Sequence, residues 1–489
     1  MIAIQTEFRP ALPNVYGAAD YREFRETLLH MDTALRAGLA DELVKRWVRK
    51  WESKRDGAVS TGRLRFMWGY AHYALRCNVA RHLMGLPFRE FSVRLADSEL
   101  LQWFCSINSF GKRKAVSKSS LERFDKWFDV QDVEEVIRKH LASLQDPQTA
   151  EELAGEDSGV ALDEILADST CVKANIHYPV DWVLLRDATR SLISAIVTIR
   201  RQGLKHRMPV PGEFVTRINR LCIQMTHSRR RKDGRKYRKQ VLREMKKLSK
   251  LVQRHGERYR EVLQARWQET EWTEKQAKVV IKRIDNVLEK LPKAIEQAHE
   301  RIIGERRVKN AEKILSLYED DIHVLVRGKA DAEVEFGNGL YLAEQRDGLI
   351  VDWELFRDQP PADSGLVKKS LQRITENYGP VRAYCGDRGF DTKANAEHLQ
   401  IENIFNGICP KAPAALAERR KEPRFMELQR RRGQTEARIG IFKNAYLGRP
   451  LRSKGFEHKR NTVAWCVLTH NLWVLARMKI TSEQQRMAA

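Results

Sequence analysis

The sequence of 489 residues lacks the features that mark cysteine-based zinc sites, membrane spans and secretion. None of its seven cysteines forms a Cys-x-x-Cys pair, which argues against a zinc site built from cysteines. No run of eighteen residues is both apolar and uncharged, so no segment predicts a membrane span. The start, MIAIQTEFRPALPN, lacks the charged-then-apolar layout of a signal peptide. Most cysteines have apolar neighbours, as in LQWFCSI, which predicts reduced, buried thiols in a cytoplasmic protein.

Acidic residues are few relative to basic ones. The chain has 65 Asp and Glu against 88 Lys and Arg, a formal net charge of +23 at pH 7. A soluble protein with this excess repels itself unless a polyanion neutralises it, so nucleic acid is the first partner that the charge predicts. A basic surface without a partner is the alternative. With 42% hydrophobic residues, the chain is apolar enough to form folded domains.

Residues 1–150 are predicted to form a helical N-terminal domain, because apolar residues recur every three or four positions from residue 20 onward. A helix over 96–105 is expected to begin at an Asp97 N-cap. A basic loop with Lys112, Arg113 and Lys114 follows, and then a second helix, SSLERFDKWF. Two helices joined by a basic loop resemble a helix-turn-helix DNA contact. A plain helical subdomain with solvated lysines is the alternative.

Residues 205–317 are predicted to form a helical insertion. Residues 227–250 include 12 Lys or Arg, among them the run Arg229, Arg230, Arg231 and Lys232. Two stretches, beginning at Val241 and Val280, repeat apolar residues at steps of three and four, so two helices are expected to pack as an antiparallel hairpin. The basic run is predicted to contact a DNA backbone. A solvated spacer is the alternative.

The segments on either side of this insertion are predicted to form one α/β domain, from 160–204 and 318–478, followed by a tail at 479–489. DEILADST predicts a strand that ends near Asp168. Farther along, GNG and RDG are expected to be hairpin turns between apolar runs. From 340 to 445 the predicted order is hairpin, helix, strand, helix, strand, helix.

Three carboxylates end or follow these elements: Asp168, Asp387 in CGDRGFD, and Glu436 on a basic helix. If they converge, they suit two Mg²⁺ or Mn²⁺ ions, which prefer oxygen ligands and support phosphodiester chemistry. Arg432 and Lys443 fall within roughly 40° of Glu436 on an ideal helix, so both are expected on an exposed face where they hold phosphates. An ordinary charged turn and a solvated basic face are the alternatives.

Several of these stretches resemble the motifs of insertion-sequence transposases of the DDE class. LADSTCVKAN resembles their first-Asp motif, and YCGDRGFD their second, in which the Asp follows the fourth strand. RRRGQTEARIGIFKN resembles their Tyr-Arg-Glu-Lys signature, and LADSELLQWFCSIN with SKSSLERF resembles their N-terminal helical domain. The chain departs from the family in having Gln429 at the signature Tyr position. Its long insertion follows the first strand, whereas relatives commonly carry one after the fifth.

The resemblance implies an α/β ribonuclease-H-like catalytic domain, split by a long helical insertion and preceded by an all-α N-terminal domain. It implies metal-dependent strand cleavage and strand transfer, with two Mg²⁺ or Mn²⁺ ions held by Asp168, Asp387 and Glu436. The expected partners are double-stranded DNA, as terminal inverted repeats and target, and a second copy in a homodimer on DNA. No membrane partner is expected, and the location is the bacterial cytoplasm at the nucleoid. A nuclease of the same fold that does not join strands, and a domesticated non-catalytic DNA-binding protein, are the alternatives.

DNA binding should weaken steeply as the salt concentration rises. A protein with a net charge of +23 that neutralises on the order of 6–10 phosphates should lose about 10³–10⁵ in affinity between about 50 and 200 mM salt. Dissociation constants for a duplex across this series measure the effect. A flat response would contradict the inference of a nucleic-acid partner.

Overall fold

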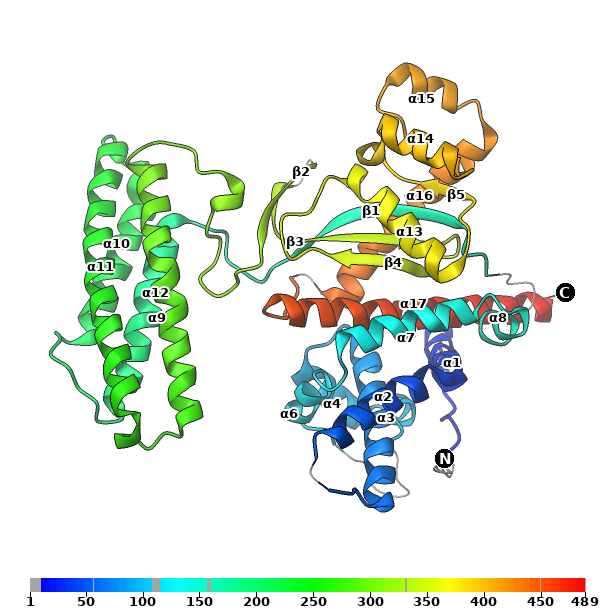
Figure 1. The fold of residues 1–489 in the computed structure, drawn as a ribbon, viewed down its shortest axis with the longest axis horizontal. Helices are drawn as coiled ribbons and strands as arrows, with labels where there is room; N and C mark the ends of the chain where they lie inside the picture. The colour runs from blue at the N-terminus through cyan, green and yellow to red at the C-terminus, as the bar shows by residue number, and fades with distance from the viewer. Residues whose placement is uncertain are drawn as a thin grey trace. The chain divides into compact units, whose positions relative to one another are not determined.

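The computed structural model describes residues 10–55, 57–107, 115–155, 160–329, 332–448 and 450–488. It divides into two compact units. The split unit consists of Met1–Lys173 and Asn338–Ala489, and the inserted unit consists of Ala174–Gly337. The protein is mixed α/β, with a six-stranded sheet and a helical N-terminal region (Figure 1). Within the ranges given above, none of the helices has the length and apolarity needed to cross a lipid bilayer.

The N-terminal region of the split unit is helical, as predicted. Its elements are α1 (Ala19–Ala34), η1 (Leu35–Leu39), α2 (Ala40–Ser53), α3 (Thr61–Leu83), α4 (Phe88–Asp97), α5 (Glu99–Phe104), α6 (Lys118–Phe124), α7 (Val130–Ser143) and α8 (Pro147–Ala154). The predicted Asp97 N-cap is wrong. Asp97 ends α4, and Ser98 caps α5 because its extended backbone lets its side chain accept a hydrogen bond from the Leu101 amide. The loop residues Lys112, Arg113 and Lys114 lie outside the described residues.

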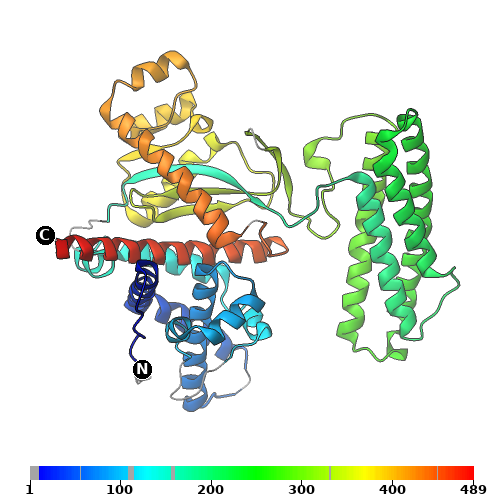
Figure 2. The same cartoon turned by 180° about the vertical axis from the view of Figure 1, so that it is seen from behind.

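The C-terminal helix α17 (Phe456–Ala488) runs between the sheet and the N-terminal helices (Figures 1 and 2). It is buried over most of its length, from Phe456 to Ile480, and its buried residues include the polar Lys459 and Asn461 as well as apolar side chains. One hydrophobic core therefore joins the N-terminal helices, α17 and the sheet. Residues 479–488, expected to form a tail, continue the helix.

The sheet has the strand order β2-β3-β1-β5-β6, and β4 pairs with β3. Its strands are β1 (Glu164–Lys173), β2 (His323–Lys329), β3 (Ala332–Glu344), β4 (Ile350–Leu355), β5 (Ala383–Cys385) and β6 (Phe405–Asn406). β1 pairs in parallel with β5, and β5 with β6, whereas β3 is antiparallel to both β2 and β4. The predicted order of elements after 340 is confirmed except that two helices, α15 and α16, follow β6 where one was predicted. The helical elements between β4 and α17 are η5 (Asp363–Gly365), α13 (Val367–Tyr378), η6 (Arg388–Phe390), α14 (Lys393–Ile401), α15 (Pro413–Arg419), α16 (Pro423–Ile441) and η7 (Phe442–Leu447).

Two strand predictions are wrong. β1 does not end near Asp168 but continues to Lys173, where it neighbours β3. The GNG segment, 337–339, is not a turn, because β3 runs through it. Asn338 is fully buried there and donates a hydrogen bond to the Phe356 carbonyl at 3.0 Å, so its amide serves the interior. The RDG segment is the β3–β4 turn, closed by Gly348 at a φ of +101°.

The inserted unit contains four long helices around one hydrophobic core. Its helical elements are α9 (Asp181–Arg201), α10 (Pro211–His227), η2 (Ser228–Arg230), α11 (Gly234–Arg266), η3 (Trp267–Glu269), α12 (Glu274–Ile302) and η4 (Asn310–Glu312). The unit is larger than the predicted hairpin at 205–317, because α9 packs in the same core. A Cβ at Gly256 of α11 would lie 3.1 Å from Leu192 of α9 and 3.6 Å from Leu288 of α12. The apolar faces of α11 and α12 are therefore covered by more than each other.

The turn at Gly85 tests how tightly α3 packs on η7. Gly85 has a φ of +60°, and an added Cβ would lie 2.4 Å from the carbonyl oxygen of Ala445. Gly85→Ala should destabilise the protein by about 1–3 kcal/mol, because both the backbone conformation and the contact oppose a side chain. The denaturation midpoint measures this. The control is Gly62→Ala, where no atom lies within 4 Å of the added Cβ. Equal destabilisation by both substitutions would contradict the packing argument.

Candidate active site

The pairing of two parallel strands places Asp168 and Asp387 at equivalent positions. The register pairs Leu166 of β1 with Cys385 of β5, and each Asp lies two residues beyond its member of that pair. Because side chains alternate along a strand, Leu166 and Asp168 share one face of β1. β5 ends at Cys385, so the pairing between β1 and β5 stops before it reaches the two aspartates. The sequence predicted that the two carboxylates converge and placed Asp168 at a strand end, whereas Asp168 lies inside β1.

Helix α16 packs on the same face of these strands. Its Leu428 lies in a small buried cluster with Leu166, Ala383 and Cys385. Gln429, at the position where the family signature has Tyr, donates a hydrogen bond to the Gly407 carbonyl at 2.7 Å. That carbonyl follows β6, so Gln429 fastens α16 to the end of the sheet. Burial raises the pKa of Cys385 to about 12, and its thiol donates to the Leu428 carbonyl.

Arg432 contacts Glu436 and is near enough to Asp168 for their charges to interact. Its guanidinium forms an ion pair with Glu436, one turn along α16, and its Nε lies 3.3 Å from Oε1 of Gln429. Burial acts to lower the pKa of Arg432, but the charges of Glu436 and Asp168 outweigh it and the pKa is raised. The Arg432 side chain is 22% exposed and that of Glu436 is 53% exposed. Arg432 and Glu436 were expected one helical turn apart, and the structure shows that they also contact each other directly.

Asp387 is held by the turn that follows β5. Its Oδ1 accepts a hydrogen bond from the Gly389 amide at 2.7 Å. A Cβ at Gly389 would lie 2.9 Å from that oxygen and 2.7 Å from Oδ2 of Asp363. Two carboxylates therefore approach one glycine. Asp363 was not predicted, because no motif or spacing in the sequence marks the loop that carries it.

A cavity of about 530 Å³ opens beside Asp387 and Glu436. Four arginines contribute to its lining: Arg388, Arg420, Arg430 and Arg432. Asp168 is not among the lining residues. Four guanidinium groups around two carboxylates suit an anion that carries several oxygens, because planar Arg binds phosphate oxygens in pairs.

Lys443 does not lie on an exposed face, which corrects the sequence expectation. It is 8% exposed, and its ammonium group donates to Oγ1 of Thr170 at 2.9 Å. Thr170 follows Asp168 by two residues on β1 and so shares its face. The expectation assumed a continuous α-helix, whereas α16 ends at Ile441 and the π-helical turn η7 carries Lys443. A π-helix changes the angle between successive side chains, which turns Lys443 toward the strand.

The predicted basic run of the inserted unit is exposed. Arg229, Arg230, Arg231 and Lys232 lie in η2 and the turn that joins α10 to α11. Arg231 forms an ion pair with Asp233 at 2.9 Å and stacks over the Tyr237 ring, 4.1 Å from its centre. The structure thus presents these cations to solvent, at one end of the helices of that unit.

The oxygen atoms of the carboxylates at this site are of the kind that hard divalent cations bind. Asp168 and Asp387 offer carboxylate oxygens from neighbouring strands, and Mg²⁺ and Mn²⁺ prefer such ligands. Glu436, the third predicted ligand, is held by Arg432. In the part of the chain that the structure describes, no three His, Cys, Asp or Glu side chains are grouped closely enough to hold a metal ion. A contact between Glu436 and a cation would require the ion pair with Arg432 to open.

Comparison with known proteins adds no further assignment. The chain matches no protein-family model, no curated protein and no solved structure. Its functional interpretation rests on its own residues and their geometry.

Substitutions at Lys443 and Arg432 should have different effects on stability. Lys443→Ala removes a buried hydrogen bond, so it should cost about 1–3 kcal/mol and lower the melting temperature. Arg432→Ala removes a partly solvated ion pair and should change stability by about 1 kcal/mol or less. Thermal unfolding in a metal chelator measures both. A larger loss for Arg432→Ala than for Lys443→Ala would contradict the assigned burial.

Proposed function

We propose that the protein is a DNA transposase of the DDE class that cleaves and joins strands at the ends of an insertion sequence. One observation carries the proposal. Asp168 and Asp387 occupy equivalent positions on the parallel pair β1–β5, and α16 brings Arg432 and Glu436 to the same face. The residues that resemble the transposase motifs are 168, 387 and 436. They lie far apart in sequence, and the pairing of β1 with β5 and the packing of α16 on that face support a common role.

The topology of the split unit supports a ribonuclease-H-like catalytic domain. Its strands, in chain order, are β1, the second half of β3, β4, β5 and β6. Asp168 lies on the first of these, and Asp387 follows the fourth, as the resemblance implies. Glu436 lies on α16, the helix that crosses the sheet after the fifth strand (Figure 2). These positions agree with the order of the three family motifs.

The residues would act on a phosphodiester as follows. Asp168, Asp387 and Glu436 would hold two Mg²⁺ or Mn²⁺ ions, which when bound activate an attacking oxygen and stabilise the leaving one. Arg432, released from Glu436, would hold an oxygen of the scissile phosphate. Arg388, Arg420 and Arg430, which line the same cavity, would hold neighbouring phosphates. Gln429 and Leu428 would keep α16 in register with the strands.

The partners follow from the same proposal. A net charge of +23 and the arginine-lined cavity favour double-stranded DNA, both as the ends of the element and as target. A homodimer on DNA and a place at the bacterial nucleoid in the cytoplasm are expectations of the family resemblance and belong to the proposal.

Substitution of the three carboxylates tests the proposal. Asp168→Ala, Asp387→Ala and Glu436→Ala should each reduce cleavage of the element's ends by at least about 10²–10³-fold, because each removes a metal ligand that supplies several kcal/mol. Binding of the same DNA in a chelator should change little. The assay uses labelled ends, target DNA and Mg²⁺, and separates cut from joined products.

Asp391→Ala is the matched control. Asp391 lies four residues from Asp387, and its carboxylate accepts a hydrogen bond from the Lys411 amide at 2.8 Å, so it supports the loop. It should retain most of the activity. Cleavage without joining by the unsubstituted protein would favour the nuclease alternative. Near-normal cleavage by any of the three variants would remove that residue from the site.

A further inference from the structure

One face of α11 carries a stripe of exposed cations. We define the α11 stripe by its six members: Lys236, Arg243, Lys247, Lys250, Arg254 and Arg258. At about 100° per residue, these positions fall within an arc of about 80°. Gln240 is the remaining residue of that arc between the two ends of the stripe. The stripe therefore contains no acidic and no apolar residue.

Acids lie close to both ends of the stripe. Asp233 is near enough to Lys236 for their charges to interact, and Glu261 falls within the arc three residues after Arg258. Glu244 and Glu257 of α11 lie outside the arc, and Glu257 accepts a hydrogen bond from Gln253 at 3.0 Å. Other cations of α11 do have partners: Lys239 pairs with Glu305, and Arg260 with Asp285. Within the described residues, no ion pair involves a member of the stripe. Like charges three and four residues apart repel, so the stripe destabilises the helix unless an anion covers it.

Packing fixes the direction in which the stripe faces. The opposite side of α11 is buried, with Val241, Met245, Leu248 and Val252 in the core of the unit. Gly256 lies close against Leu192, so α11 cannot rotate without breaking this packing. The cations are thus presented to solvent by a rigid element.

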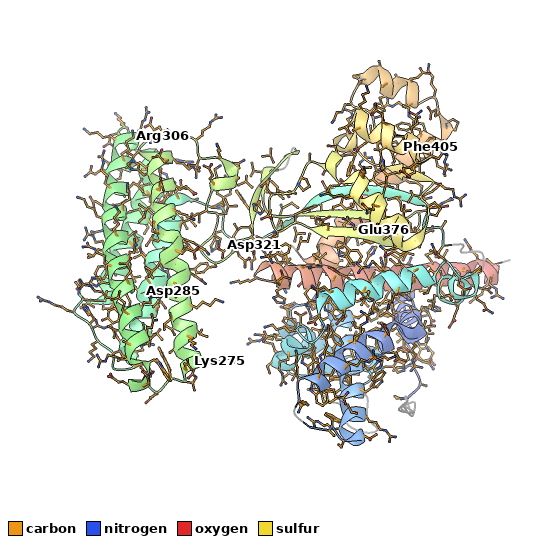
Figure 3. All side chains as sticks on the ribbon, in the orientation of Figure 1. Lys275, Asp285, Arg306, Asp321, Glu376 and Phe405 are labelled. Atoms are coloured by element: carbon orange, nitrogen blue, oxygen red, sulfur yellow. The ribbon has the colours of Figure 1, made fainter. Side chains whose placement is uncertain are left out.

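The neighbouring helix α12 shows that such a stripe is not a general property of the unit. The corresponding arc of α12 contains Lys275, Val279, Lys282, Asn286, Glu289, Lys293 and Gln297. An apolar residue, an amide and an acid interrupt its lysines. Lys275 and Asp285 of this helix are labelled in Figure 3. The exposed face of α12 is thus mixed in charge and polarity, whereas the charged residues of the α11 stripe are all cationic.

We propose that the α11 stripe binds the phosphate backbone of duplex DNA, independently of base sequence. From Lys236 to Arg258 the helix rises about 33 Å, close to the roughly 34–36 Å of one DNA turn. Cations alone position a backbone and do not read bases. Arg229, Arg230 and Lys232, which precede the stripe in the chain, are exposed as well. The choice of DNA as the polyanion rests on the proposed function, and the stripe adds a second contact outside the catalytic residues.

Two full-length variants with equal charge change test the stripe. The first carries Lys236→Gln, Arg243→Gln, Lys247→Gln and Arg254→Gln. The control carries Lys275→Gln, Lys282→Gln, Arg283→Gln and Lys293→Gln, all exposed positions on α12. Binding to a duplex of unrelated sequence is measured in a chelator over a salt series, and circular dichroism compares the folds.

The stripe variant should lower the slope of log affinity against log salt by about 3.6, since each lost phosphate contact removes about 0.9. The control should change the slope by less than about 1. Equal loss in both variants, or no loss in the first, would overturn the proposal. So would a lack of duplex binding by the unsubstituted protein, or equal competition by single-stranded RNA of the same length.

Because no cleavage occurs in the chelator, this test is separate from that of the catalytic carboxylates. Suppose that the salt slope falls in the stripe variant while the carboxylate variants cleave normally. The proposed role of the stripe in DNA binding would then be supported, and the proposed transposase activity would be rejected. Cleavage and joining by the unsubstituted protein, with an unchanged slope in the stripe variant, would reject the stripe alone.

Discussion

The parallel pairing of β1 with β5 is the constraint on which the rest of the candidate site depends. It sets Asp168 and Asp387 two residues beyond a shared register pair. A slip of one residue would turn Asp168 to the opposite face of the sheet, since side chains alternate along a strand. Helix α16 depends on the same pairing, because Leu428 packs on both strands and Gln429 bonds the backbone after β6. The position of Glu436 is therefore set by strand register as well as by its own helix.

The elements that follow and flank α16 also help to hold the candidate site in place. The π-helical turn η7 carries Lys443 against β1, and η7 is in turn held from two sides. The end of α3 meets it at Gly85, and the Cys466 thiol of α17 donates to the Tyr446 carbonyl at 3.3 Å. The N-terminal helices are thus part of the core that positions the candidate site. A DNA contact by this region would share its packing with the strands of the candidate site.

Much of the fold was accessible from sequence, because local patterns specify local elements. Apolar periodicity predicted the N-terminal helices, and the motif residues 168, 387 and 436 lie where strands and a helix were expected. Features set by long-range contacts were missed. Burial of the Asn338 amide overrides its turn propensity, and nothing local signals the π-helical turn that buries Lys443. Asp363 approaches Gly389 only through the folding of two loops. The N-terminal region, expected to be a separate domain, shares its core with the sheet.

The chain enters and leaves the inserted unit at neighbouring points, and this affects how freely the unit can vary in evolution. The unit begins at Ala174, directly after β1, and ends at Gly337, within β3. Its two ends are already neighbours, since the Ala174 amide donates to the Phe336 carbonyl at 3.0 Å. In topological terms the whole unit is an enlarged loop between two adjacent strands. The separation of its ends does not depend on the length of chain between them, and loop-closure entropy grows only slowly with that length. The four-helix unit can therefore be lengthened, exchanged or reduced to a short hairpin turn in evolution, while the register of β1 and its aspartate stays the same.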